Sequence, residues 1–178
     1  FIFLNFLSIS SFANEFVGII GAGVGEVKNQ NNQKLENGSK IFYGDTIIVG
    51  SKSTAQVLFL DQTVMTLGED SELKIDEFVY DPETNDGKFV SNIKSGTIKI
   101  ITGKISKKDP DNLEIKIPTG AIGARGTEFV VLANSKNENT VLLLGPGPNN
   151  SLGMTPGNLE VTDGVNSVNI IQPGFETV

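Results

Sequence analysis

The chain has 178 residues, 38% of them apolar, which is the size and composition of one globular domain with a hydrophobic core of its own. It contains no Cys and no His, which excludes disulfides, thiolate catalysis, Cys- or His-ligated metals and His-assisted nucleophiles. Its 14 Lys and Arg against 21 Asp and Glu give a net charge of −7, which argues against nucleic-acid binding because phosphates require a basic surface. We expect a non-enzymatic protein without cofactor or metal.

Residues 1–13 are expected to be a secretory signal peptide that begins inside its apolar region. Residues 1–9 are almost all apolar, and Ser11 and Ala13 are small residues at the spacing of a cleavage site after Ala13. The run is too short to span a bilayer, which takes about 20 apolar residues, and no later stretch predicts a transmembrane helix. The mature chain, from Asn14, is therefore expected to be exported by a bacterium, either periplasmic or secreted; a buried first strand is the alternative interpretation.

Beyond residue 13 the apolar residues recur with a period of two, which predicts β-strands. The predicted strands cover residues 55–60, 64–67, 73–75, 98–100, 113–117, 129–132, 141–144, 159–161 and 168–171. Residues 129–132 and 141–144 are apolar at every position, as in strands buried on both faces. No window of about twelve residues carries the apolar stripe of a helix. The predicted fold class is all-β, a single domain of about a dozen short strands arranged as a sandwich or a β-solenoid-like stack, with little or no helix.

Changes in composition divide the chain into segments. A glycine-rich leader strand is expected over residues 14–24, followed by the main β domain over residues 25–144. Residues 145–157 are expected to be a Gly/Pro loop, because their prolines and glycines prevent a strand ladder from passing through. Residues 158–178 are expected to form a C-terminal β-hairpin of the same domain.

Three motifs that are typical of dinucleotide binding, serine catalysis and calcium binding match the sequence only in part. The glycines of residues 18–25 lack the G-x-G-x-x-G spacing, and a polar turn rather than a helix follows them, which argues against a dinucleotide loop. Ser91 and Lys94 fit S-x-x-K, but the alternating segment around them predicts a strand that places them on opposite faces. The acidic turn that starts at Asp81 has its glycine one position too late for a calcium loop. We therefore predict no catalytic residue and no metal ligand.

Arg125 is the only arginine among the 14 basic residues. Its planar guanidinium holds a carboxylate or several carbonyls in a fork that Lys does not reproduce. Two interpretations are open: an internal clasp that locks two layers of strands, with Asp45 and Asp61 as candidate counter-ions, or a contact with a partner or ligand. Glycines flank the arginine, and a crowded turn or a positive φ is expected at Gly126, so a side chain there should be tolerated less well than at Gly87.

Residues 117–129 read Ile-Pro-Thr-Gly-Ala-Ile-Gly-Ala-Arg-Gly-Thr-Glu-Phe. Shorter motifs precede this stretch in the chain, at residues 35–38, 43–47, 53–61, 71–73 and 95–98. Through these motifs the chain resembles the FecR domain family over about residues 25–132, with a weaker resemblance to residue 178. The resemblance implies a structural signature made of Pro118, Thr119, Gly123, Arg125, Gly126, Thr127 and Phe129. The chain departs from the family at Gln62, where the family usually has Gly, and this departure predicts a different turn type because Gln tolerates a positive φ poorly.

The resemblance implies an all-β, non-catalytic module that signals or docks through protein contacts. Regulatory members carry an anti-sigma helix bundle and a transmembrane helix before this domain, whereas here a signal peptide is expected in that place. We therefore expect an exported sensor or scaffold module in envelope signalling that binds another envelope or membrane protein through strand edges or residues 145–157, without nucleic acid and without a transmembrane segment of its own. The alternative is an extracellular carbohydrate- or matrix-binding β domain, which the absence of Trp and the presence of only two Tyr disfavour.

Overall fold

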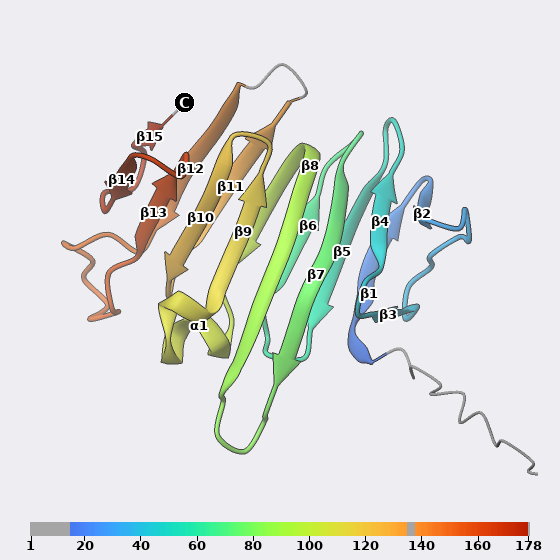
Figure 1. Ribbon diagram of the computed structural model, residues 1–178, viewed down its shortest axis with the longest axis horizontal. Helices are drawn as coiled ribbons and strands as arrows, with labels where there is room; N and C mark the ends of the chain where they lie inside the picture. The colour runs from blue at the N-terminus through green and yellow to red at the C-terminus, as the bar shows by residue number, and fades with distance from the viewer. Residues whose placement is uncertain (1–14, 135–137, 178) are drawn as a thin grey trace, which may run out of the picture.

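The computed structural model describes residues 15–134 and 138–177, so the expected signal peptide lies outside the described residues. The described chain folds as a β-sandwich of two sheets, A and B, which Figure 1 shows as two layers. The prediction of an all-β fold is confirmed. The structure has 15 strands rather than about a dozen, because β2, β3 and β15 hold only two or three residues and leave little trace of period two in the sequence.

The two sheets share one strand, β8. Sheet A contains, in spatial order, β3 (Lys40–Phe42), β1 (Phe16–Val24), β5 (Thr54–Phe59), β6 (Val64–Leu67), the second half of β8 (Gly87–Ile101), β11 (Glu128–Ala133), β12 (Asn139–Gly145) and β15 (Glu176–Thr177). Sheet B contains β2 (Val27–Asn29), β4 (Thr46–Val49), β7 (Glu72–Tyr80), the first half of β8, β9 (Leu113–Ile117), β10 (Gly120–Arg125), β13 (Asn158–Thr162) and β14 (Ser167–Ile170). These pairings are antiparallel except the parallel pair β8–β9.

β8 passes from sheet B to sheet A at Gly96. Its first half pairs with β7 up to Ser95, and its second half pairs with β11 from Gly96 onward. Gly96 has a φ of +93°, and a Cβ atom there would lie 2.5 Å from the Cα of Ser71. Only glycine combines this backbone conformation with so close an approach. This residue therefore lets a single strand belong to both layers.

The core lies between the two sheets and is filled by the inward-facing residue of each alternating pair. Phe59, Phe78 and Phe89 pack on one another with ring centroids 4.6 to 5.8 Å apart, the range of favourable aromatic pairs. β11 and β12 alternate in the same way, and Leu132 and Leu144 are 50% and 41% exposed. The prediction that residues 129–132 and 141–144 are buried on both faces is wrong, because the described part of the chain does not cover the outer face of sheet A.

A short helical crossover connects β8 to β9, since parallel strands cannot be joined by a tight turn. It consists of α1 (Lys104–Lys108) and a 3-10 turn (Pro110–Asn112), and it lies below β9 and β10 in Figure 1. Ile105 of α1 is buried in the core. Within residues 15–134 and 138–177 these are the only helical segments, which agrees with the prediction of little helix. No helix of that described region is long and apolar enough to cross a bilayer.

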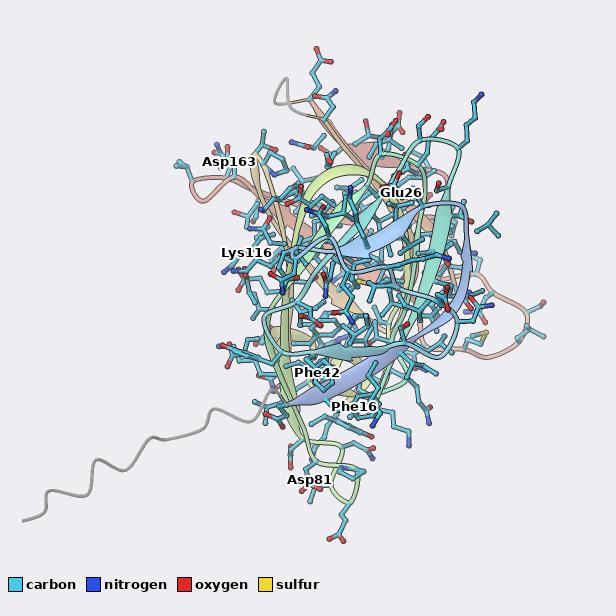
Figure 2. The ribbon with its side chains drawn as sticks, turned by 90° about the vertical axis from the view of Figure 1, so that its right-hand side faces the viewer. Phe16, Glu26, Phe42, Asp81, Lys116 and Asp163 are labelled. Carbon is cyan, nitrogen blue, oxygen red and sulfur yellow. The ribbon has the colours of Figure 1, made fainter. Side chains whose placement is uncertain are left out.

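The first and the last strands of the described chain lie at opposite ends of the sandwich (Figure 1). At one end β1 pairs with β3, and Phe16 lies opposite Phe42, as Figure 2 shows. At the other end β13 and β14 form a hairpin that extends sheet B, and β15 pairs with β12 in sheet A. Residues 146–157, between β12 and β13, hold no strand.

Candidate functional site

The signature segment, residues 117–129, crosses from one sheet to the other. It runs from the end of β9 through β10 in sheet B and enters β11 in sheet A. The crossing lies at Gly126 and Thr127, between the two strands. Gly126 has a φ of +50°, which glycine adopts at no steric cost. The positive φ expected at this glycine is confirmed.

The inward half of the signature is anchored at the point where the chain crosses between the sheets. Phe129 is fully buried in the core, and Thr127 is nearly so. The Thr127 N–H donates to the Thr102 hydroxyl at 2.9 Å, and the Thr127 hydroxyl donates to the Gly145 carbonyl at 2.9 Å. Thr102 and Gly145 lie 25 and 18 residues away in sequence, which is why no local pattern identified them as partners. Thr127 therefore joins the ends of β8 and β12 to the crossing.

In the outward half of the signature, the Thr119 hydroxyl accepts a hydrogen bond from the Asn139 side-chain N–H at 2.7 Å, whereas Gly123 and Arg125 have no such contact in the described chain. Arg125 is exposed, and its side chain forms neither an ion pair nor a hydrogen bond with any residue in the described part of the chain. A Cβ atom at Gly123 would meet nothing within 4 Å. Pro118 and Thr119 are exposed in the turn between β9 and β10. Packing within the chain therefore requires neither glycine at 123 nor arginine at 125.

Asp45 and Asp61, the candidate counter-ions, form no ion pair with Arg125 and have other partners. The Asp45 carboxylate accepts a hydrogen bond from the Phe42 N–H at 2.9 Å and so closes the turn between β3 and β4. Arg125 occupies an outward position of β10, next to the buried Ala124, so alternation along the strand directs it to solvent. The described chain therefore does not form the internal clasp.

Asp61 is fully buried at the start of α1. Its carboxylate accepts the Thr63 N–H at 3.0 Å and the Thr63 hydroxyl at 2.8 Å, while its carbonyl accepts the Lys104 N–H at 2.7 Å. The Thr63 hydroxyl in turn accepts the Gly103 N–H at 3.0 Å. Burial raises the pKa of Asp61 above its usual value, and the hydrogen bonds from Thr63 offset part of that effect. These contacts fasten the β5–β6 turn to α1, which is a structural role.

The turn after Asp61 contains a residue in the left-handed backbone conformation although that residue is not glycine. Gln62 has a φ of +71°, and its N–H donates to the Phe59 carbonyl at 3.0 Å. The expectation that Gln avoids a positive φ at this position is therefore wrong. The contacts that Asp61 makes with α1 hold the turn, and they outweigh the roughly 1–2 kcal/mol that a left-handed conformation costs a residue with a Cβ atom.

Crowding is found at Gly87 and not at Gly126. A Cβ atom at Gly87 would lie 2.2 Å from the Val79 carbonyl oxygen, whereas one at Gly126 would meet only the Lys107 side chain at 3.9 Å. The close approach at Gly87 arises from the pairing of β7 with β8, which the sequence pattern does not contain. The expected order of tolerance at the two glycines is therefore reversed.

A surface groove of about 330 Å³ opens beside the crossing. Its lining comes from β8, α1, the signature and residues 145–157: Ile101, Thr102, Lys107, Gly126, Thr127, Glu128, Gly145, Pro146 and Met154. Glu128 is paired with Lys99 at 2.5 Å, so the lining offers no pair of free carboxyl groups of the kind that hydrolysis requires. No group of three His, Cys, Asp or Glu suited to a metal ion is found among residues 15–134 and 138–177.

The comparison with protein families agrees with the resemblance noted in the sequence. A family model described as FecR protein matches residues 45–145, more than half of the 178 residues, and this match contains the whole signature segment. The resemblance to this family is confirmed. No curated protein and no solved structure showed significant similarity to the chain.

Proposed function

The chain belongs to the FecR family, and from this membership we propose that it is an exported, non-catalytic module that binds another envelope or membrane protein. In this role it serves as a sensor or scaffold in envelope signalling. The FecR family is a regulatory and signalling family rather than an enzymatic one. Periplasmic or secreted localisation and the binding of a protein partner are the parts of the proposal that experiment must test.

The unpaired guanidinium of Arg125 is the observation that carries this proposal. On the same outer face of sheet B, the Lys74 ammonium lies 2.9 Å from an Asp76 carboxylate oxygen, and Lys94 lies 2.8 Å from Glu72. Arg125 has no such partner in the described chain. A guanidinium left in water by its own chain is suited to the forked binding of a carboxylate on a second protein, and Arg is enriched at protein interfaces.

The surface next to Arg125 carries both signs of charge. Gly123 lies on the same face of β10, and in the sheet it stands opposite Glu114 of β9 and Glu160 of β13. Because Gly123 has no side chain, the backbone of β10 lies open between the two carboxylates. A partner that fits this strip presents a carboxylate to Arg125 and hydrogen-bond donors to the two glutamates. Such complementarity gives protein interfaces their specificity.

Site-specific photo-crosslinking in bacteria tests the binding of a partner. A photoreactive phenylalanine analogue replaces Ala121, which lies on the same outward strip and leaves Arg125 intact, in the full chain with a C-terminal affinity tag. We expect a light-dependent adduct with one envelope or membrane protein, and we expect Arg125→Ala to abolish it. The same analogue at Lys52, in the turn between β4 and β5, is the control and should give no such adduct.

Three results would contradict the binding proposal. They are the absence of an adduct at 121, an adduct of equal yield in Arg125→Ala, and the same adduct from position 52. An adduct formed only with a second copy of this chain would contradict the choice of a different protein as the partner.

Export is tested separately by fractionation and N-terminal sequencing of the same tagged chain. We expect the protein in the periplasm or the medium, with Asn14 as its first residue. A chain that retains residues 1–13 and stays in the cytoplasm would contradict export.

A further inference from the structure

The free side of β14 forms one end of sheet B. β14 pairs with β13 on one side and has no strand on the other among the described residues. Figure 1 shows this hairpin at the end of the sandwich, beyond β10. The backbone groups on the free side of a terminal strand are able to pair with a strand from another chain.

The other three terminal strands are short or protected. The edge of β2 is covered by the bridge between Lys28 and Lys34 and by the hydrogen bond from the Leu35 N–H to Val27. β3 carries the exposed Lys40, and β15 has only two residues. β14, in contrast, has four residues without charge, proline or bulge. Proteins usually block open edges with short strands, charges, prolines or bulges. Among the described residues, β14 is the terminal strand that none of these features blocks.

The register of the hairpin identifies which groups of β14 face outward. The Asp163 N–H donates to the Asn166 carbonyl at 3.2 Å and so closes the turn. From this pair, hydrogen-bonded and non-bonded pairs alternate along an antiparallel ladder. Val168 and Ile170 therefore bond to β13, and Asn169 directs its N–H and C=O to the free edge.

Apolar surface lies along the same edge. Val168, Ile171 and Phe175 are 50%, 51% and 63% exposed. Two hollows meet at Val168, one of about 270 Å³ between the sheets and one of about 380 Å³ along residues 168–176. The first hollow is lined in part by Asn139, whose buried Oδ1 has no hydrogen-bond partner among the described residues. A strand added beside β14 would cover this surface with every second side chain.

The charge of this end of the molecule is negative. Residues 138–177 contain Glu138, Glu160, Asp163 and Glu176, and they contain neither Lys nor Arg. Glu160 lies directly opposite Asn169 on the outer face of the sheet, and Figure 2 shows Asp163 projecting from the molecule on the same side as Lys116. Arg125 lies two strands in from the edge. Complementary charge on a partner segment therefore means Lys or Arg.

We propose that β14 accepts an extended segment of another protein as an added strand, and that this segment alternates apolar residues with Lys or Arg. The apolar side chains cover Val168 and the two hollows, and the basic side chains lie on the outer face beside Glu160. This inference rests on the protein-binding function proposed above and specifies how the partner is held. Backbone hydrogen bonds supply affinity, and the alternation of side chains supplies selectivity.

A binding experiment with defined peptides tests this inference on the full chain. The probe is a short blocked peptide of alternating lysine and valine, and alternating glutamate and valine is its charge-reversed counterpart. Asn169→Pro removes the outward N–H without removing a bond to β13, and proline is tolerated on such an edge. Asn169→Ala is the matched control, since it removes the side chain and keeps the N–H.

We expect the lysine–valine peptide to bind the wild type and Asn169→Ala equally and Asn169→Pro about tenfold more weakly. Binding should also slow hydrogen exchange of the Asn169 amide in the wild type, and this measurement does not depend on how the proline variant folds. Equal affinity for Asn169→Pro, or an unprotected Asn169 amide, would overturn strand addition. Equal binding of the glutamate–valine peptide would overturn the basic character of the partner, and no binding of either peptide would overturn the whole inference.

The failure of this inference is distinguishable from the failure of the proposed function. If the peptide does not bind but the Arg125-dependent adduct at position 121 forms, protein binding stands and only strand addition is lost. If the peptide protects Asn169 but no adduct forms at 121, the proposed function loses its support and the edge remains a strand acceptor.

Discussion

Thr102 and Thr127 hydrogen-bond to each other in both directions at the point where the chain crosses between the sheets. The Thr127 N–H donates to the Thr102 hydroxyl at 2.9 Å, and the Thr102 N–H donates to the Thr127 carbonyl at 3.0 Å. Both residues are buried, so water does not replace these bonds. The signature segment thus has an inward half that stabilises the crossing and an outward half, with Arg125, that faces solvent.

Thr127→Val is expected to lower the free energy of unfolding by about 1–3 kcal/mol, since it removes the hydroxyl that donates to the Gly145 carbonyl and leaves that carbonyl without the bond. Valine keeps the branched shape, so the loss reports the hydrogen bond rather than a cavity. Urea unfolding followed by circular dichroism measures it. An unchanged unfolding midpoint would show that the Thr127 hydroxyl does not stabilise the crossing.

Arg125→Ala is expected to change the free energy of unfolding by less than about 0.5 kcal/mol, because exposed side chains without partners contribute little to stability. Arg125→Lys should behave in the same way. The same urea titration, with Thr127→Val as the positive control, measures both variants. A loss of more than about 1 kcal/mol in either would indicate a stabilising contact within the chain.

Asp61 is expected to contribute more stability as the pH falls. Because burial raises the folded-state pKa of Asp61 above its ordinary value of 3.8, the folded chain binds a proton at pH values where the unfolded chain does not. This contribution is fully present below the unfolded pKa and is lost as the pH rises through the folded pKa. Asp61→Asn does not titrate. The free energy of unfolding of the wild type minus that of Asp61→Asn should therefore grow as the pH is lowered from about 7 to about 4.

Urea unfolding of both proteins across this pH series measures the difference. Hydrogen bonds lower the pKa values of Asp81, Asp86 and Asp163, and these groups act with the opposite sign. They are present in both proteins, so the subtraction removes them. A difference that stays constant or shrinks as the pH falls would contradict a raised pKa at Asp61.

Gly87→Ala is expected to destabilise the protein by about 3 kcal/mol, because the new Cβ atom would overlap the Val79 carbonyl and force the hairpin apart. Gly126→Ala is expected to cost only about 1 kcal/mol, since the site has room and only the positive φ is unfavourable. Thermal unfolding of the two variants compares them directly. The opposite order would place the crowded backbone at the crossing.

Gln62→Gly is expected to stabilise the protein by about 0.5–1 kcal/mol, because glycine adopts the φ of +71° without strain. Gln56→Gly is the matched control: Gln56 lies within β5, where glycine should destabilise. The two variants should therefore move the melting temperature in opposite directions. A decrease in both would show that the Gln62 side chain contributes more than its backbone strain removes.

The period-two pattern of the sequence by itself determined the fold class and several strand positions. The predicted strands at residues 64–67 and 113–117 coincide with β6 and β9. They could be predicted because alternation in sequence corresponds directly to the two faces of a strand. The signature likewise pointed to the FecR family and to a special backbone conformation at Gly126, since both depend on residues close together in the chain.

Only the tertiary structure decided which strands are neighbours and which faces meet water. Alternation of apolar and polar residues shows which face of a strand is buried, but not which strand lies beside it. The sequence therefore could not predict the passage of β8 between the sheets at Gly96 or the crowding at Gly87. The exposure of Arg125 also depends on whether another layer covers sheet B. That is a property of contacts between distant segments, and for this reason one arginine between glycines was compatible with both a buried clasp and an outward-facing side chain.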